Sequence, residues 1–152
     1  MKTLAIMLLA ALSWGSLLAQ TTSEVFGQYV GLKNSLVDGD AKKSSVSASA
    51  LLKSFETMTV VDDQKSRVST IMVSLGKIKE EKKLEAQRAE FAKLSESFWQ
   101  YLQGDQSFKE AHYYIYCPMK KWYWVSESNT IRNPFYGKQM LSCGKVELTG
   151  NN

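Results

Sequence analysis

Hydrophobic residues recur at helical spacing in four consecutive stretches of the chain. The first runs from Glu24 to Val37 and the second from Ala41 to about Met58. The third opens at Asp62 and Asp63, and the fourth begins near Glu81 and ends at Gly104. Each stretch has one apolar stripe and one polar face, so each needs neighbours to cover its stripe. Because short connections favour antiparallel neighbours, the pattern predicts an up-down helical bundle.

The stripes and the breaks between them can be assigned to residues. Gly39 is the expected stop of the first helix, and Asp40 the expected cap of the second. The expected stripe of the first helix is Phe26, Tyr29, Val30, Leu36 and Val37, and that of the second is Val46, Ala50, Leu51, Phe55 and Met58. In the third it is Val68, Ile71, Met72, Leu75 and Ile78, and in the fourth Leu84, Phe91, Leu94, Phe98 and Leu102.

The pattern changes in the tail, from about residue 108 to 152. The runs 112–116 and 122–125 are aromatic and favour strands, and a further strand is expected over 145–149. Asn133–Gly137 has the composition of a turn. We therefore expect a mainly α protein whose bundle carries a small C-terminal aromatic β-hairpin or irregular cap.

The first 19 residues have the pattern of a secretory signal peptide. Lys2 precedes an apolar run from Leu4 to Leu12, and the small residue Ala19 precedes a polar stretch. The run is shorter than the roughly 20 residues that a membrane-spanning helix needs. We expect cleavage after Ala19, a periplasmic or secreted location, and no membrane association after cleavage. Residues 20–152 then form a single domain.

Composition and motifs narrow the classes of function. Without Lys2, 18 of the 19 basic residues remain against 15 acidic ones, spread rather than clustered, which argues against nucleic acid as a partner. The sequence has no Cys-x-x-Cys pair, no His-Glu-x-x-His motif and no phosphate-binding glycine loop. Its carboxylates lie among lysines, as in 79–83, which is typical of a solvated helix face. We expect that the protein is not an enzyme.

Sulfur-containing residues gather at two points in the tail. Cys117 is followed by Met119, and Cys143 is preceded by Met140. Residues two apart share a side of an extended segment, and residues three apart share a side of a helical turn. If one segment folds over the other, up to four sulfur atoms can converge, a donor set that suits Cu(I) or Ag(I). His112 is a weaker candidate ligand, since a histidine without a ligand role is the simpler interpretation.

The cysteines also allow other interpretations. Exported proteins often contain disulfides, and a Cys117–Cys143 bond would stabilise the fold by about 3 kcal/mol. The protein would then be a disulfide-stapled interaction module without metal, with the aromatic tail as its docking surface. Zinc bound by both cysteines and His112 would need a fourth ligand that the tail does not obviously provide.

Two parts of the chain carry distinctive strings. The tail contains Tyr116–Met119, Ile131–Gly137 and Met140–Gly144, and the helical half contains Leu36–Ala41 and Gln87–Ser95. In these strings the chain resembles a bacterial periplasmic family of unknown function. That family occurs alone in Bacteroidetes-type bacteria and also fused to the adaptor subunits of Cus-type copper/silver efflux pumps.

The resemblance implies heavy-metal handling in the periplasm, with Cys117, Met119, Met140 and Cys143 as candidate ligands. It implies buffering of Cu(I) or Ag(I), or delivery to efflux, with an efflux adaptor or another periplasmic metal-handling protein as partner. The chain departs from the family pattern at one point. Family members usually have a longer loop, often containing glycine, between Cys-Pro-Met and Tyr-Trp, whereas here only Lys120–Trp122 intervenes. The shorter link puts any ligand from that loop in doubt.

Overall fold

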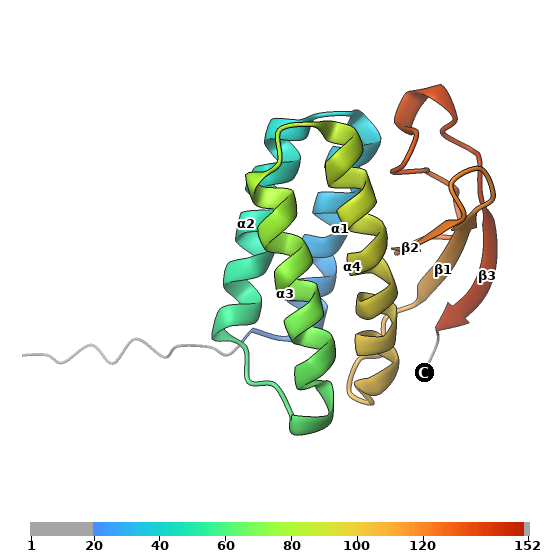
Figure 1. Ribbon diagram of the computed structural model, residues 1–152. Helices are drawn as coiled ribbons and strands as arrows, with labels where there is room; N and C mark the ends of the chain where they lie inside the picture. The colour runs from blue at the N-terminus through green and yellow to red at the C-terminus, as the bar shows by residue number, and fades with distance from the viewer. Residues whose placement is uncertain (1–19, 151–152) are drawn as a thin grey trace, which may run out of the picture.

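The computed structural model describes residues 20–150 and shows a helical bundle followed by a small sheet (Figure 1). The helices are α1 (Thr22–Asp38), α2 (Ala41–Thr57), α3 (Lys65–Glu80) and α4 (Leu84–Gly104), with a 3-10 turn, η1 (Asp62–Gln64), before α3. The strands are β1 (His112–Cys117), β2 (Trp122–Ser126) and β3 (Lys145–Gly150), with a second 3-10 turn, η2 (Gly137–Gln139), before β3. The prediction of a mainly α bundle with a C-terminal β cap is confirmed. The predicted signal peptide, 1–19, lies outside the described residues.

The break between α1 and α2 follows the local sequence. Gly39 has a φ of 77° and donates its N–H to the Leu36 carbonyl oxygen at 3.2 Å. Glycine adopts this left-handed conformation without the steric cost that a Cβ imposes. The Asp40 carboxylate then accepts the Lys43 N–H at 2.9 Å and caps α2. Both the stop at Gly39 and the cap at Asp40 were predictable from sequence.

The expected stripe of α2 is partly wrong. Val46 is 64% exposed and Ala50 is also exposed, whereas the buried face consists of Ser44, Ala48, Leu51, Ser54 and Phe55. The helix turns small side chains toward its neighbours, because Ser44 and Ala48 allow closer approach than a valine would. Each described helix still has one exposed face, and within residues 20–150 none is long and apolar enough to cross a membrane.

Tyr29 of α1 joins the core of the bundle to the sheet. Its ring stacks on Phe98 of α4 with the centroids 4.3 Å apart, and on Phe91 at 5.2 Å. Stacked pairs of this kind contribute about 0.5–1.5 kcal/mol beyond the area they bury. The buried Tyr29 hydroxyl bonds to Ser95 at 2.6 Å and accepts the Val125 N–H of β2 at 3.0 Å. Burial raises the pKa of Tyr29, so the hydroxyl stays neutral.

The sheet is antiparallel with the strand order β2-β1-β3, and β2 lies nearest to α4 (Figure 1). In this register Cys117 at the end of β1 pairs with Trp122 at the start of β2. Strand β3 forms the outer edge, with a bulge between Tyr114 and Ile115 in its pairing with β1. The further strand expected over 145–149 is present as β3 and joins the β1–β2 hairpin in one sheet.

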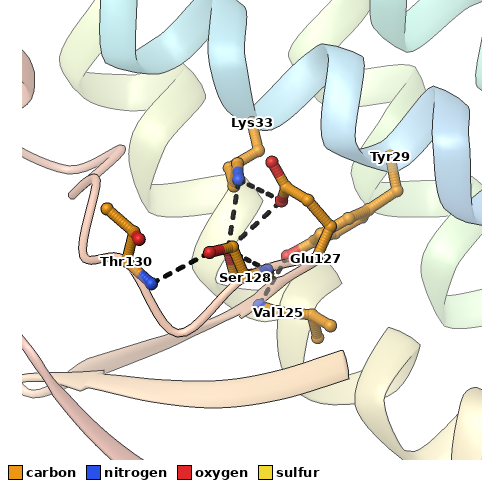
Figure 2. A network of polar contacts seen from close by, with 7 residues as sticks. Tyr29, Lys33, Val125, Glu127, Ser128 and Thr130 are labelled. Atoms are coloured by element: carbon orange, nitrogen blue, oxygen red, sulfur yellow. Dashed lines mark hydrogen bonds and ion pairs between the residues drawn. The ribbon is translucent and has the colours of Figure 1, made fainter. Parts of the chain in front are cut away.

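An ion pair between a buried lysine and a partly exposed glutamate fastens the segment that follows β2 to α1 (Figure 2). Lys33 of α1 is 1% exposed, and its Nζ lies 2.5 Å from Glu127 Oε2 and 3.3 Å from Ser126 Oγ. Ser126 Oγ also accepts the Ser128 N–H, and Ser128 Oγ accepts the Thr130 N–H. This network fixes the start of the long segment 127–144, which carries the second cysteine.

Candidate dithiol site

The fold brings the two cysteines together from distant parts of the tail. Cys117 is the last residue of β1 and is completely buried, and Cys143 lies half-buried in the turn before β3. Both are free thiols, and they lie close enough together for Cys117 to raise the pKa of the Cys143 thiol. Two of the predicted site residues are therefore direct neighbours.

Asn133 holds the two cysteine segments in this arrangement. It is completely buried, and its Nδ2 donates to Cys117 Sγ at 3.2 Å and to the Cys143 carbonyl oxygen at 2.6 Å. Its Oδ1 accepts the Phe135 N–H at 2.8 Å, so both ends of the amide are used. One side chain thus bridges the end of β1, the 133–137 turn and the turn at Cys143.

The expected extended segment through Met119 is wrong, because β1 ends at Cys117. The Lys121 N–H donates to the Cys117 carbonyl oxygen at 2.8 Å and closes a turn, with Lys121 at a φ of 58°. Within this turn the Met119 side chain is 61% exposed, whereas Cys117 is buried. Met119 nevertheless lies close to the site, since its backbone N–H acts to lower the pKa of Cys143.

The segment that carries Met140 and Cys143 forms the predicted turn. The Cys143 N–H donates to the Met140 carbonyl oxygen at 3.1 Å, and the Met140 side chain is half-buried. Gly144 follows because no side chain fits there. A Cβ at this position would lie 2.6 Å from Trp124 Cη2. The ring of Trp124 therefore requires the glycine that follows Cys143 in the sequence.

His112 lies apart from the cysteines, at the opposite end of β1. Cys117 is five positions further along the strand, which corresponds to roughly 16 Å. Its ring is buried against Phe108 and Trp99, with centroids 5.1 and 5.2 Å away. Both ring nitrogens have partners, Nδ1 with the Glu110 carbonyl oxygen at 2.7 Å and Nε2 with Gln103 Nε2 at 2.9 Å. The fold does not bring His112 to the thiols.

The environment of Cys143 favours its protonated form. Burial beside the other thiol raises the pKa of Cys143, and the charge and hydrogen bond of Cys117 raise it further. The Met119 N–H acts in the opposite direction but is the smaller influence. A soft metal ion would therefore have to displace a proton from this sulfur, so its affinity should fall as the pH falls.

The arrangement supports two kinds of chemistry. Two adjacent thiols can bind a soft metal ion as thiolates, or they can be oxidised to a disulfide. Within residues 20–150, no three or more His, Cys, Asp or Glu side chains gather in a way that could hold a metal ion. The zinc site of two cysteines and His112 is accordingly not assembled there. Met119 and Met140 are the predicted candidates for a further ligand near the thiols.

Sequence reasoning missed Asn133 as a residue of the site. It was expected only to begin a turn, and that turn is present, since the Gly137 N–H donates to the Asn133 carbonyl oxygen at 2.9 Å with Gly137 at a φ of 55°. The contact with Cys117 spans 16 residues, and no local pattern reports it. One feature of the sequence could have pointed to it. Asn133 lies in one of the tail strings that carry the family resemblance, and the two cysteines lie in the others.

Comparison with known proteins gives one match. A family model described as "Protein of unknown function (DUF3347)" matches residues 25–110. The matched range covers α1 to α4 and ends before β1, so it does not include either cysteine. No curated protein and no solved structure matches the chain. Because the family model covers more than half of the 152 residues, the chain belongs to this family of unknown function, DUF3347.

Proposed function

We propose that this protein binds Cu(I) or Ag(I) through Cys117 and Cys143, as a periplasmic protein that buffers the ion or delivers it to an efflux system. The observation that carries the proposal is the close approach of the two cysteines, which the Asn133 amide bridges. Thiolates are soft donors, and two of them at one point match the low coordination numbers and covalent bonding of these ions. The proposed partner is an efflux adaptor or another periplasmic metal-handling protein.

The surroundings of the thiols support entry and release of an ion. Cys143 is half-buried rather than enclosed, so an ion can reach it from solvent. The backbone of Met119 lies close enough to Cys143 to influence its pKa, and the flexible, exposed thioether of Met119 can turn toward an ion held there. Met140 is bonded to Cys143 through its carbonyl oxygen and is the second candidate for an additional thioether ligand. Entry and release of the ion involve no catalytic turnover, so under this proposal the protein binds the ion and is not an enzyme.

The test is an anaerobic competition titration of the reduced protein against a colorimetric Cu(I) chelator. We expect one ion per chain, and affinity at least tenfold weaker in Cys117→Ser and in Cys143→Ser, because each variant removes one thiolate. Met72→Leu, which removes a half-buried thioether from α3, is the matched control and should leave the affinity unchanged. Wild-type affinity in the double cysteine variant would exclude the proposal.

A second candidate function rests on the same close approach of the two thiols. Oxidation would join Cys117 and Cys143 covalently and staple β1 to the turn before β3, leaving an interaction module without metal. Its docking surface would include Tyr114 and Tyr123, two half-buried rings that stack with their centroids 4.7 Å apart. Counting thiols in protein purified without reductant separates the two functions. If the protein has no free thiol and takes up no Cu(I) after reduction, the disulfide-linked interaction module is favoured.

A further inference from the structure

Exposed apolar side chains lie in the turns beside the half-buried Cys143. Within residues 20–150 six large apolar side chains are exposed, and two of them are Met119, at 61%, and Leu141, at 39%. The Met119 backbone lies close enough to influence the pKa of Cys143, and the Leu141 carbonyl oxygen accepts the Asn133 N–H at 2.8 Å. The fold thus leaves an apolar rim in solvent next to the dithiol site, which is characteristic of surfaces that a partner covers.

Access to the dithiol site runs through one of the two cysteines. Cys117 is completely buried, whereas Cys143 is half-buried, so a donor atom from another protein reaches a bound ion on the Cys143 side. Hand-over of the ion is then a ligand exchange in which a partner sulfur bonds to Cu(I) while the two cysteine sulfurs leave it. Cu(I) keeps its oxidation state, and each cysteine thiolate takes up one proton from water.

The turn that carries Met119 is fastened to the bundle. The Lys120 ammonium pairs with Glu85 of α4 and lies 5.2 Å from the centroid of the Trp122 ring. It also lies 5.4 Å from the ring centroid of Tyr136, so two aromatic faces and one carboxylate hold this cation. Because the charge of Lys120 is used inside the protein, the apolar rim is held in place before a partner arrives.

Basic side chains outnumber acidic ones in this part of the tail. Between Cys117 and Lys145 the chain has five basic residues and one acidic residue, Glu127, which pairs with Lys33. Lys120 and Lys145 also have carboxylate partners. Three basic side chains are exposed and form no ion pair in the described part of the chain, namely Lys121, Arg132 and Lys138. The segments that carry the cysteines therefore have an excess of positive charge.

We propose that the face around Cys143 is an exchange surface for a protein that presents a sulfur donor among acidic residues and exchanges Cu(I) with the dithiol site. The inference rests on the proposed function and names the chemistry of its partner. Opposite charges accelerate the encounter of two proteins, whereas a basic partner is repelled. Once the two meet, the apolar rim is removed from water. The residues of the exchange surface are Met119, Lys121, Lys138 and Leu141.

The test measures Cu(I) transfer from two synthetic peptides to the reduced protein. Both peptides hold Cu(I) through the same methionines, which are flanked by glutamates in one peptide and by lysines in the other. Stopped-flow absorption of the Cu(I)–thiolate charge-transfer band gives the rate. At low salt we expect the acidic peptide to deliver Cu(I) about tenfold faster than the basic one, and the difference to shrink as salt screens the charges. Equal rates from the two peptides would overturn the proposal.

Two pairs of substitutions show whether the local charges are responsible. Lys121→Asp combined with Lys138→Glu should slow transfer from the acidic peptide about tenfold. Aspartate is chosen at position 121 because the backbone there has a φ of 58°, which aspartate tolerates better than most residues. Lys42→Asp combined with Lys53→Glu, at two exposed positions of α2, changes the net charge equally and should leave the rate unchanged. Equal slowing by both pairs would show that net charge, and not this surface, governs the exchange.

The apolar part of the exchange surface has its own test. Leu141→Ser should slow transfer from both peptides about threefold, because it removes apolar contact area but no charge and no sulfur ligand. Unchanged rates in this variant would exclude the apolar rim from the exchange surface.

Equilibrium affinity separates this inference from the proposed function. Chelator competition should give the same Cu(I) affinity for the wild type and for all these variants, since none of them replaces a sulfur atom. A wild-type protein that binds no Cu(I) would overturn the proposed function and this inference together. A protein that binds Cu(I) but takes it equally fast from both peptides would overturn this inference alone.

Discussion

Replacing Asn133 with leucine is expected to lower the free energy of unfolding by about 3 kcal/mol, because the change leaves two backbone groups without partners. The Phe135 N–H loses the Oδ1 acceptor, and the Cys143 carbonyl oxygen loses the Nδ2 donor. Leucine has nearly the same size but can replace neither bond. Urea unfolding of the reduced protein measures the loss. Asn129→Leu, at an exposed position in the same segment, is the control and should change stability by less than about 0.5 kcal/mol.

The same substitution should also separate the thiols. Asn133 is the side chain bonded to both cysteine residues, so its removal releases the turn at Cys143 from the end of β1. A monosubstituted arsenical, which needs two neighbouring thiols, should therefore bind the variant at least tenfold more weakly than the wild type, measured under conditions where the variant is still folded. An Asn133→Leu protein that keeps both its stability and its arsenical affinity would show that Asn133 does not position the cysteines.

Replacing Glu127 with alanine is expected to cost about 2 kcal/mol of stability. The change leaves the ammonium group of Lys33, a side chain only 1% exposed, with Ser126 Oγ as its remaining hydrogen-bond partner in the network of Figure 2. Removing one partner of a buried pair typically costs about 3–5 kcal/mol. Glu127 is 42% exposed, so solvent screens the pair and we expect a smaller loss. Glu56→Ala, on the exposed face of α2, is the matched control.

A second substitution tests whether the unpaired charge of Lys33 causes the loss of stability in Glu127→Ala. Adding Lys33→Met to Glu127→Ala should restore most of the lost stability, because it replaces the unpaired ammonium with an apolar side chain of similar length. Urea unfolding of the two single variants and the double variant completes a double-mutant cycle. If the double variant is no more stable than Glu127→Ala alone, the buried charge is not the source of the loss.

The pH dependence of this effect has a definite sign. Burial acts to raise the pKa of Glu127, but the hydrogen bond and charge of Lys33 outweigh it and hold the pKa below the ordinary value of 4.5. A carboxyl group with a lowered pKa stabilises the fold fully above its ordinary pKa, and the contribution is lost as the pH falls through the folded value. The difference in stability between the wild type and Glu127→Ala should therefore be constant near neutrality and shrink below about pH 4.5.

Local features of the helical half were readable from the sequence because they depend on neighbouring residues. Gly39 and Asp40 end one helix and begin the next through bonds that reach at most five residues. The stripe of α3 followed from its spacing, and its five members are buried or half-buried. The stripe of α2 was assigned wrongly at Val46 and Ala50, because this helix has few large apolar residues. Which of its small residues face inward depends on α1 and α3, and not on the helix itself.

The candidate dithiol site could be predicted only in part from the sequence. The sequence identified Cys117 and Cys143 as the residues with distinctive chemistry, and it placed Met140 correctly in a turn with Cys143. It could not show that β1 ends at Cys117, which exposes Met119 in the following turn. That end point depends on the register with β2, where Cys117 pairs with Trp122.

The sequence by itself therefore determined the four helices, most of their buried stripes and the presence of two thiols in an aromatic tail. These properties follow from periodicity, capping and residue type, which act over a few residues. Only the tertiary structure decided that the two cysteines lie close together, that Asn133 bridges them and that His112 lies at the far end of β1. Such contacts depend on strand register and on the packing of the tail against α1 and α4, where the free energy comes from residues far apart in the chain.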